Sequence, residues 1–279
     1  MHSAEISKGQ RFQFGANWAA FLSTLDEDRI LQAELSLKNM LAVESLAGTR
    51  FLDVGSGSGL FSLVARRLGA EVHSLDYDPQ SVACTRELKR RYFNDDAGWT
   101  IDEASVLDDS YLRSIGKFDV VYSWGVLHHT GQMQLALNNV MIPLADSGKL
   151  FIAIYNDQGI ISKFWRSVKR LYCTGLIGRI AVCCVFIPYF ILRGILHGLR
   201  EYKNPFASFS NYRKQRGMSP YHDWIDWLGG YPFEVAKPEM LFDLYKQHGF
   251  TLERLTTTNC LACNQFVFKR NAPAQSRAA

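Results

Sequence analysis

Three glycines and two aspartates are spaced in a way that suits a nucleotide-like ligand. The stretch FLDVGSGSGL places Asp53 just ahead of Gly55, Gly57 and Gly59, and Asp76 ends the next apolar run. A strand that turns into a helix through glycines presents backbone N–H groups and the positive end of the helix to a ligand. A carboxylate about twenty residues further on accepts hydrogen bonds from ribose hydroxyls. The spacing therefore predicts a site for a molecule that contains a ribose.

Two features of this loop argue against a dinucleotide. Leu60 stands where the dinucleotide fingerprint G-x-G-x-x-G has its third glycine. Asp53 would repel a pyrophosphate, whereas it suits a ligand that carries an ammonium group. S-adenosylmethionine has a ribose and an ammonium group but no phosphate. We therefore expect S-adenosylmethionine as the cofactor, with a tight strand-to-helix turn that binds nothing as the alternative.

Two histidines and a tyrosine–asparagine pair follow later apolar runs. His128 and His129 come after the run FDVVYSW, where a histidine can titrate near neutral pH and act as a general base. His129 is the preferred base, and packing of the turn is the alternative for both rings. Tyr155 and Asn156 follow the run LFIAI, where they could orient a polar substrate or set Tyr155 against a sulfonium. An ordinary strand exit with an Asx turn explains this pair equally well.

Aromatic side chains elsewhere are candidates for closing a site. Phe14 and Trp18 precede the first long helix, where they could exclude water from the cofactor or simply dock that helix. Tyr212 and Tyr221 lie in a basic and aromatic stretch that we expect to fold over the substrate as a lid. A nucleic-acid groove is the alternative, although this stretch has no long Lys/Arg stripe.

The apolar pattern alternates between short runs and helical spacing. Strands are expected near residues 50–54, 71–75, 99–101, 118–123, 149–154, 251–255 and 265–268, with helices between most of them. Short links between alternating strands and helices imply a parallel sheet covered by helices on both faces. The sequence thus predicts an α/β, doubly wound (Rossmann-like), mostly parallel seven-stranded sheet with a helical insertion after the fifth strand.

This alternation divides the chain into four parts. Residues 1–156 form a cofactor-binding core with an N-terminal helical segment, residues 157–236 a helical and aromatic cap or lid, and residues 237–270 complete the core. Residues 271–279 are expected to be a disordered tail.

One run inside the cap is apolar throughout. Residues 180–192 are too few to span a bilayer, and Pro188 would kink a helix there. Basic residues on both sides would suit a helix that lies on an anionic membrane surface. A buried cap helix or a dimer interface is the alternative.

Composition limits the partners. The 279 residues include 31 Lys and Arg against 27 Asp and Glu, an excess too small to act alone as a nucleic-acid footprint. No apolar stretch follows the first basic residues, so we expect a cytoplasmic protein without a secretory signal. Cys260 and Cys263 form a C-x-x-C with no second ligand pair nearby, and we expect no metal. A small-molecule substrate is expected, and the sequence does not determine the oligomeric state.

The segments FLDVGSGSG, LDYDP, FDVVYSWGVLHHT and LADSGKLFIAIYN resemble successive motifs of class I S-adenosylmethionine-dependent methyltransferases. The resemblance covers about residues 10–155 and 238–268 and is greatest to the small-molecule branch that includes ubiquinone-biosynthesis O-methyltransferases and phosphoethanolamine methyltransferases. It implies that Asp53 and the loop glycines surround the methionine part and Asp76 the ribose. It further implies that Ser105 and Val106 contact the adenine and that the backbone of Ser123 reaches the methionine part.

The resemblance implies a methyltransferase, with O-methylation slightly favoured because a histidine base is present. Three alternatives stay open at the level of sequence. The first is an enzyme that cyclises or cleaves S-adenosylmethionine and releases methylthioadenosine without methyl transfer. The others are an RNA methyltransferase and a cofactor sensor without turnover.

Overall fold

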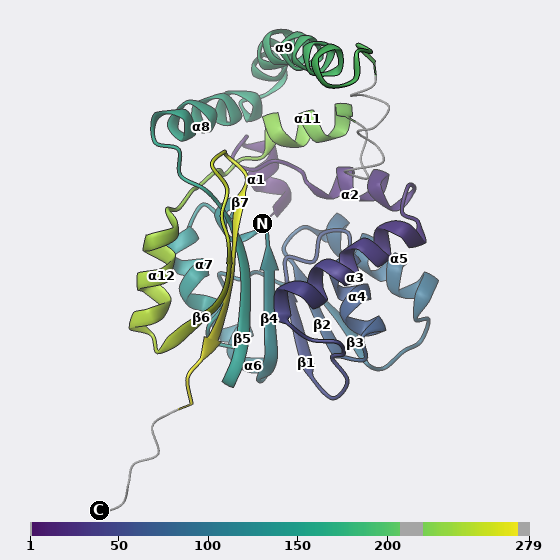
Figure 1. The fold of residues 1–279 in the computed structure, drawn as a ribbon, viewed down its shortest axis with the longest axis vertical. Helices are drawn as coiled ribbons and strands as arrows, with labels where there is room; N and C mark the ends of the chain where they lie inside the picture. The colour runs from purple at the N-terminus through teal and green to yellow at the C-terminus, as the bar shows by residue number, and fades with distance from the viewer. Residues whose placement is uncertain (1, 207–219, 273–279) are drawn as a thin grey trace, which may run out of the picture.

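The structure is a computed structural model that describes residues 2–206 and 220–272. Within these residues the strands form one seven-stranded sheet in the order β3-β2-β1-β4-β5-β7-β6 (Figure 1). The strands are β1 (Arg50–Val54), β2 (Glu71–Asp76), β3 (Trp99–Glu103), β4 (Phe118–Trp124), β5 (Leu144–Tyr155), β6 (Phe250–Thr256) and β7 (Cys263–Arg270). Strands β1 to β5 pair in parallel, and β7 runs antiparallel to β5 and β6. The predicted doubly wound, mostly parallel sheet is confirmed.

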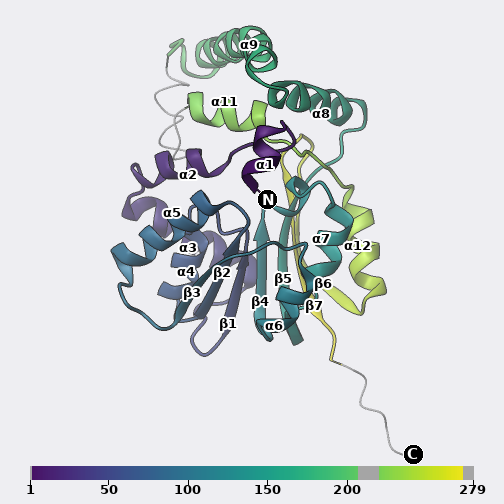
Figure 2. The same ribbon diagram turned by 180° about the vertical axis from the view of Figure 1, so that it is seen from behind.

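Each face of the sheet carries its own apolar core. Leu52 and Val54 of β1 belong to one core, and Phe51 between them belongs to the other, because successive strand residues point to opposite faces. The core around Phe51 is covered by α3 (Glu27–Leu41), α4 (Leu60–Arg67) and α5 (Pro79–Tyr92), and the opposite core by α6 (Asp109–Ser114), α7 (Met133–Asn139) and α12 (Pro238–Gln247) (Figure 1 and Figure 2). Each fully buried Leu or Phe contributes about 2 kcal/mol. The two cores together fix where the strand ends lie.

Aspartates mark where three of the helices begin. Asp26, Asp78 and Asp108 each accept a hydrogen bond from a backbone N–H in the first turn of α3, α5 and α6. Helix α4 differs, because its N-cap is Gly59, which has a φ of 81° and supplies no side chain. The positive end of α4 therefore faces the glycine loop without a capping carboxylate.

The winding direction of the sheet changes at β1. This strand pairs with β2 on one side and with β4 on the other. In sheets of this kind, ligands bind in the crevice beyond the carboxyl ends of the strands at the point where the winding changes.

Helices from two distant parts of the chain form a cap over this edge of the sheet (Figure 1). The N-terminal part supplies α1 (His2–Ser7) and α2 (Gly15–Leu22), and the segment after β5 supplies α8 (Ile160–Cys173), α9 (Leu176–Tyr202) and α11 (Pro220–Gly229). A third apolar core joins Phe12 to Tyr172, Val182 and Leu228. The insertion after the fifth strand is therefore helical where the structure describes it.

Helix α9 is longer than the sequence pattern predicted. It runs for 27 residues and continues through Pro188, whereas we expected an apolar run of residues 180–192. By length and composition alone, α9 is long and apolar enough to cross a membrane. The prediction that this segment is too short to span is therefore wrong. Only 6% of its most apolar window is buried, which also argues against a buried cap helix within the described residues.

Candidate active site

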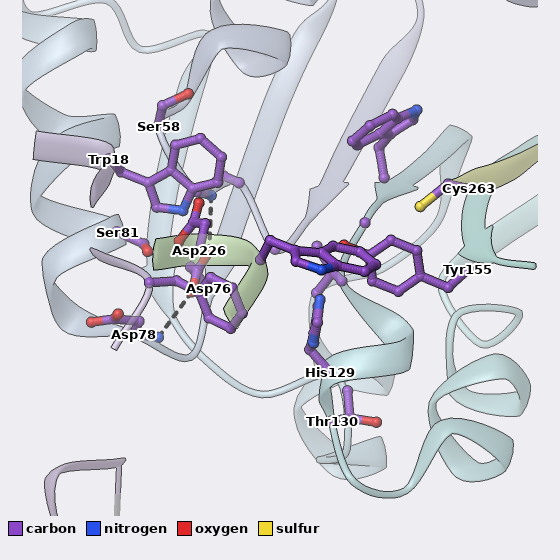
Figure 3. A pocket seen from close by; sticks show the side chains of 18 of the residues that line it. Trp18, Ser58, Asp76, Asp78, Ser81, His129, Thr130, Tyr155, Asp226 and Cys263 are labelled. Carbon is purple, nitrogen blue, oxygen red and sulfur yellow. Dashed lines mark hydrogen bonds between the residues drawn. The ribbon is translucent and has the colours of Figure 1, made fainter. Parts of the chain in front are cut away.

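A cavity of about 1550 Å³ lies between the carboxyl edge of the sheet and the cap. Its lining includes the glycine loop, the ends of β2, β4 and β5, and residues of α2, α8, α9 and α11. Figure 3 shows Trp18, Asp76 and Asp78 at one end, with His129, Tyr155 and Cys263 at the other. Pockets for a single small ligand usually measure about 300–1,000 Å³. The cavity therefore has room for a cofactor and a second molecule.

The glycine loop has a backbone shape that only glycine adopts without strain. Gly55, Gly57 and Gly59 all have positive φ, of 82°, 56° and 81°. A Cβ on Gly55 would lie 2.4 Å from Val126, which follows β4, and one on Gly59 would lie 2.9 Å from the Cα of Thr85. The loop is thus packed between the link after β4 on one side and α5 on the other, and it borders the cavity.

Asp76 joins this loop to the end of β2. Its Oδ2 accepts a hydrogen bond from the backbone N–H of Gly57 at 2.9 Å, and its Oδ1 accepts one from the backbone N–H of Asp78 at 2.9 Å (Figure 3). Burial raises the pKa of Asp76 to about 6, against the lowering effect of these two bonds. Each carboxylate oxygen has a second lone pair, so the group can also accept from ribose hydroxyls.

Asp53 is 2% exposed and borders the same cavity. Its Oδ2 accepts a hydrogen bond from the Ser62 hydroxyl at 2.6 Å. Burial raises the pKa of Asp53 to about 7, the Ser62 bond lowers it, and the charge of Asp76 adds to the rise. A cationic ligand group would offset both the burial and the repulsion between the two carboxylates.

Of the residues expected to contact the adenine and the methionine part, Ser105 and Val106 line the cavity and Ser123 does not. Ser105 and Val106 border the cavity, with the Ser105 hydroxyl accepting from the backbone N–H of Leu107 at 3.1 Å. Ser123 is fully buried, and its hydroxyl donates to the Val54 carbonyl at 2.9 Å. The cavity wall beside it is formed by the next residue, Trp124.

His129 borders the cavity, and its surroundings fix its tautomer. Its Nδ1 lies 2.6 Å from the Pro232 carbonyl oxygen, so Nδ1 carries the proton and Nε2 keeps its lone pair. Burial lowers the pKa of His129 to about 3, with further lowering by the charges of Lys169 and Arg11. Burial thus shifts this histidine away from the expected titration near neutral pH and favours the neutral ring, whose Nε2 can accept a hydrogen bond.

His128 lies outside the cavity wall. It is fully buried, its Nδ1 accepts from the backbone N–H of Tyr155 at 3.4 Å, and within the described residues its Nε2 has no hydrogen-bond partner. Burial lowers its pKa well below the usual value, and the neighbouring His129 adds to this. The centre of the ring lies 4.1 Å from that of Tyr155, so the ring packs against the end of β5.

The tyrosine–asparagine pair separates at the end of β5. Tyr155 borders the cavity, where its ring contacts those of His129, Trp227 and Phe233. The Asn156 side-chain amide instead donates to the Thr258 carbonyl at 2.8 Å. It ties β5 to the loop between β6 and β7 and is not part of the cavity wall.

The N-terminal segment lies over the end of the cavity that the glycine loop borders. The backbone N–H of Gly15 donates to Asp78 Oδ2 at 2.8 Å, and the Arg11 guanidinium donates to the His129 carbonyl at 2.9 Å. Phe14 and Trp18 both border the cavity, with Phe14 packed 4.9 Å from the His129 ring. Of the predicted lid residues, Tyr212 lies outside the described residues, as do residues 273–279 of the tail, and the side chain of Tyr221 is not described either.

Two charged residues of the cap, Asp226 and Lys169, were not predicted to be part of the site. Asp226 borders the cavity and accepts a hydrogen bond from the Asn17 amide at 2.6 Å, and Lys169 is fully buried with its amine donating to the Trp227 carbonyl. Burial raises the pKa of Asp226 to about 7 and lowers that of Lys169 to about 7. Asp223 and Asp226 stand three residues apart and both border the cavity, a helical spacing that was the available signal.

Comparisons with known proteins identify the kind of domain that this chain contains. Residues 52–150 match a family described as a methyltransferase domain. A ubiquinone biosynthesis O-methyltransferase from Xanthomonas euvesicatoria pv. vesicatoria (strain 85-10) is 32% identical over 112 residues, which cover 40% of this chain and 45% of that protein. One of the same description from Sinorhizobium fredii is 25% identical over 160 residues, covering 57% and 55%. The chain thus matches about half the length of these relatives.

Solved structures share the fold. The magnesium protoporphyrin IX methyltransferase of Synechocystis PCC 6803 with bound S-adenosylhomocysteine aligns with a TM-score of 0.53 at 14% identity, over 87% of this chain and 84% of that one. An O-methyltransferase family protein from Burkholderia thailandensis aligns with a TM-score of 0.52 at 11% identity, over 88% and 56%. None of these comparisons favours cofactor cleavage, RNA methylation or a sensor. Residues 52–150 therefore form a methyltransferase domain, and the fold and the loop motif are those of class I S-adenosylmethionine-dependent methyltransferases.

Proposed function

We propose that this protein transfers the methyl group of S-adenosylmethionine to an oxygen atom of a small-molecule acceptor. One observation carries the proposal: a single cavity joins Asp53, Asp76 and the glycine loop to His129 and Tyr155. Two carboxylates with raised pKa values, Asp53 buried and Asp76 half-buried, fit a cationic cofactor with a ribose. At the other end of the cavity, His129 lies among aromatic rings and can accept the proton that a substrate hydroxyl must lose.

When bound, S-adenosylmethionine supplies a methyl group already activated by its sulfonium. Asp76 would hold the ribose, Asp53 the ammonium group, and Ser105 with Val106 the adenine. Alignment of the acceptor with the methyl group is the largest task left to the protein, since the displacement is in line. Tyr155 and the rings around it can stabilise a nearby positive charge and exclude water.

His129 can take the acceptor proton although its pKa is low. Its Nε2 lone pair can accept a hydrogen bond from an acceptor hydroxyl, because Nδ1 is held as a donor by Pro232. The hydroxyl becomes far more acidic as its oxygen bonds to the methyl carbon. A weak base in the right place therefore suffices, and the proton moves late in the reaction.

We expect His129→Ala to lower kcat by about 100-fold or more while affinity for S-adenosylhomocysteine stays within about threefold. His129→Gln, which keeps a donor for Pro232, should lose as much turnover and so separates proton transfer from folding. His248→Ala is the control, because this histidine is exposed just after α12 and lies outside the cavity. Because the pKa of His129 is about 3, the wild-type pH profile should show no limb from this residue near neutral pH. Full turnover by His129→Ala, with the cofactor still bound, would show that His129 is not the base.

Cofactor binding should strengthen as pH rises. The folded pKa values of Asp53 and Asp76 are raised to about 7 and about 6, so the stability gained from keeping these acids protonated is lost as pH rises through those values. A ligand ammonium group favours their ionised forms. Calorimetry should therefore show S-adenosylhomocysteine binding about tenfold more tightly near pH 8 than near pH 6. Asp53→Asn should remove most of this dependence of affinity on pH. An unchanged dependence would refute the proposal that Asp53 binds the ammonium group.

The nucleoside product tests the proposed reaction itself. The purified protein is incubated with S-adenosylmethionine, with and without a metabolite and lipid extract, and nucleosides are separated by liquid chromatography. Methyl transfer predicts S-adenosylhomocysteine that forms only with extract. Methylthioadenosine formed without extract would instead establish cofactor cleavage, and saturable binding with neither product a sensor.

A further inference from the structure

Helix α9 presents a long apolar surface to solvent. Ile177 is 85% exposed, Leu176 72%, Val185 63%, and Leu192 and Leu196 56% each. Exposed apolar patches of this extent on soluble proteins usually mark a contact with another body. Helix α8 extends the surface, with Ile160 83% exposed and Phe164 53% exposed. The two parts are continuous, because the Phe164 ring lies 6.3 Å from that of Phe186 on α9.

The opposite side of α9 is fixed to the cap. Val182 is 3% exposed, and the Phe186 and Phe190 rings lie 5.1 Å and 6.5 Å from that of Trp165 on α8. Phe190 also lies 5.7 Å from Trp224 on α11. A helix held along this length lies across the end of the molecule, as Figure 1 shows at the top of the view. Its exposed apolar residues lie on the side away from these contacts. This arrangement suits a helix lying in a membrane surface better than one crossing it, because crossing would break these contacts.

Charge on the same two helices identifies the partner. Residues 158–206 contain eight of the chain's 31 Lys and Arg but only one of its 27 Asp and Glu, Glu201. Seven of the eight basic residues are exposed: Lys163, Arg166, Arg170, Arg179, Arg193, Arg200 and Lys203. The remainder of the chain is net acidic, so the positive charge is concentrated beside the apolar surface. Exposed apolar residues bordered by cations match an anionic lipid bilayer.

The same helix also reaches the cavity. Tyr189, Phe190, Arg193 and His197 of α9 border it, together with Trp165 of α8 and Trp224 of α11. The cavity therefore extends from the cofactor end, past His129 and Tyr155, to aromatic residues directly beneath the apolar surface. An acceptor with an apolar tail would find an apolar and aromatic path along this end.

We propose that α8 and α9 dock on an anionic lipid surface and that the acceptor is an amphiphile that reaches the cavity from that surface. The docking stands on the exposed residues and charges alone. The acceptor class rests on the proposed methyl transfer and names its substrate more closely. The lipid head groups contact the basic residues, while Ile177, Val185 and their neighbours enter the interface.

Vesicle flotation tests the docking. Wild-type protein is mixed with vesicles of phosphatidylcholine alone or with one-third phosphatidylglycerol, and the variant Ile177→Glu/Val185→Glu is compared with Leu31→Glu, an exposed apolar site on α3. We expect wild type and Leu31→Glu to float with the anionic vesicles, more weakly at high salt, and the double variant to bind at least about tenfold less. Unchanged affinity for S-adenosylhomocysteine shows that each variant is folded.

Two results would overturn the docking. One is wild-type protein that ignores anionic vesicles, or a double variant that floats as well as wild type. The other is a dimer in solution that the double variant dissociates without any vesicle binding, which would assign the surface to a second copy of the chain.

The acceptor class is tested with S-adenosylmethionine labelled in its methyl group and isolated bacterial membranes. We expect label in the organic phase after extraction, at least about tenfold less with the double variant, and no loss with Leu31→Glu. Label that stays in the aqueous phase would refute an amphiphilic acceptor while leaving methyl transfer intact. Absence of S-adenosylhomocysteine as a product would refute the proposed function instead, whatever the vesicle result.

Discussion

Asp76→Asn is expected to weaken binding of S-adenosylhomocysteine by about 100-fold near pH 8. Both carboxylate oxygens of Asp76 already accept backbone N–H groups, from Gly57 and Asp78. An amide has one oxygen, so its NH2 must face one of these donors, and the ribose loses an acceptor as well. The effect combines a displaced loop with lost charged hydrogen bonds, and isothermal titration calorimetry measures it.

The effect of Asp76→Asn should shrink as pH falls. The folded pKa of Asp76 is about 6, so the wild-type group is itself mostly neutral below that value and resembles the amide more closely. Asp26→Asn is the matched control, since Asp26 also accepts a backbone N–H at a helix start but lies outside the cavity. Binding by Asp76→Asn within about threefold of wild type near pH 8 would remove Asp76 from the cofactor site.

Gly55→Ala is expected to lower the free energy of unfolding by about 3 kcal/mol. Alanine is strained at the φ of 82° that Gly55 adopts, and its Cβ would clash with Val126. The added Cβ would lie 2.4 Å from a Val126 methyl, and Val126 lies in the link that follows β4. Because Gly55 borders the cofactor end of the cavity, cofactor affinity should fall too. Urea denaturation with and without S-adenosylhomocysteine measures both.

Gly48→Ala separates the two causes. Gly48 has a φ of 76° but nothing within 4 Å of an added Cβ, so only the backbone term of about 1 kcal/mol applies. Equal losses in the two variants would show that the contact with Val126 does not constrain the loop.

The sequence predicted which residues meet at the glycine-loop end of the cavity, because that end depends on local spacing. Asp53, the three glycines and Asp76 lie within one strand–helix–strand unit, and backbone geometry alone brings them to one edge. The alternation of strands and helices likewise predicted the sheet. These are short-range signals, and few arrangements of the chain are compatible with them.

The other end of the cavity depends on contacts between distant residues, which one sequence does not reveal. Asn17 and Asp226 are 209 positions apart, yet their side chains meet. The lowered pKa of His129 arises from burial under the N-terminal segment and the cap, and the amide of Asn156 is taken up by a loop about a hundred residues later. The length of α9 was also underestimated. The apolar run of residues 180–192 ends at Arg179 and Arg193, whereas the helix, which packs on α8 and α11, continues beyond both arginines.

The crystal structure of the protein in complex with S-adenosylhomocysteine tests the central claim most directly. The account predicts ribose hydroxyls within hydrogen-bond distance of Asp76, the ammonium group beside Asp53, and the sulfur directed toward His129 and Tyr155. A ligand bound away from the glycine loop, or one whose sulfur faces away from His129 and Tyr155, would contradict it.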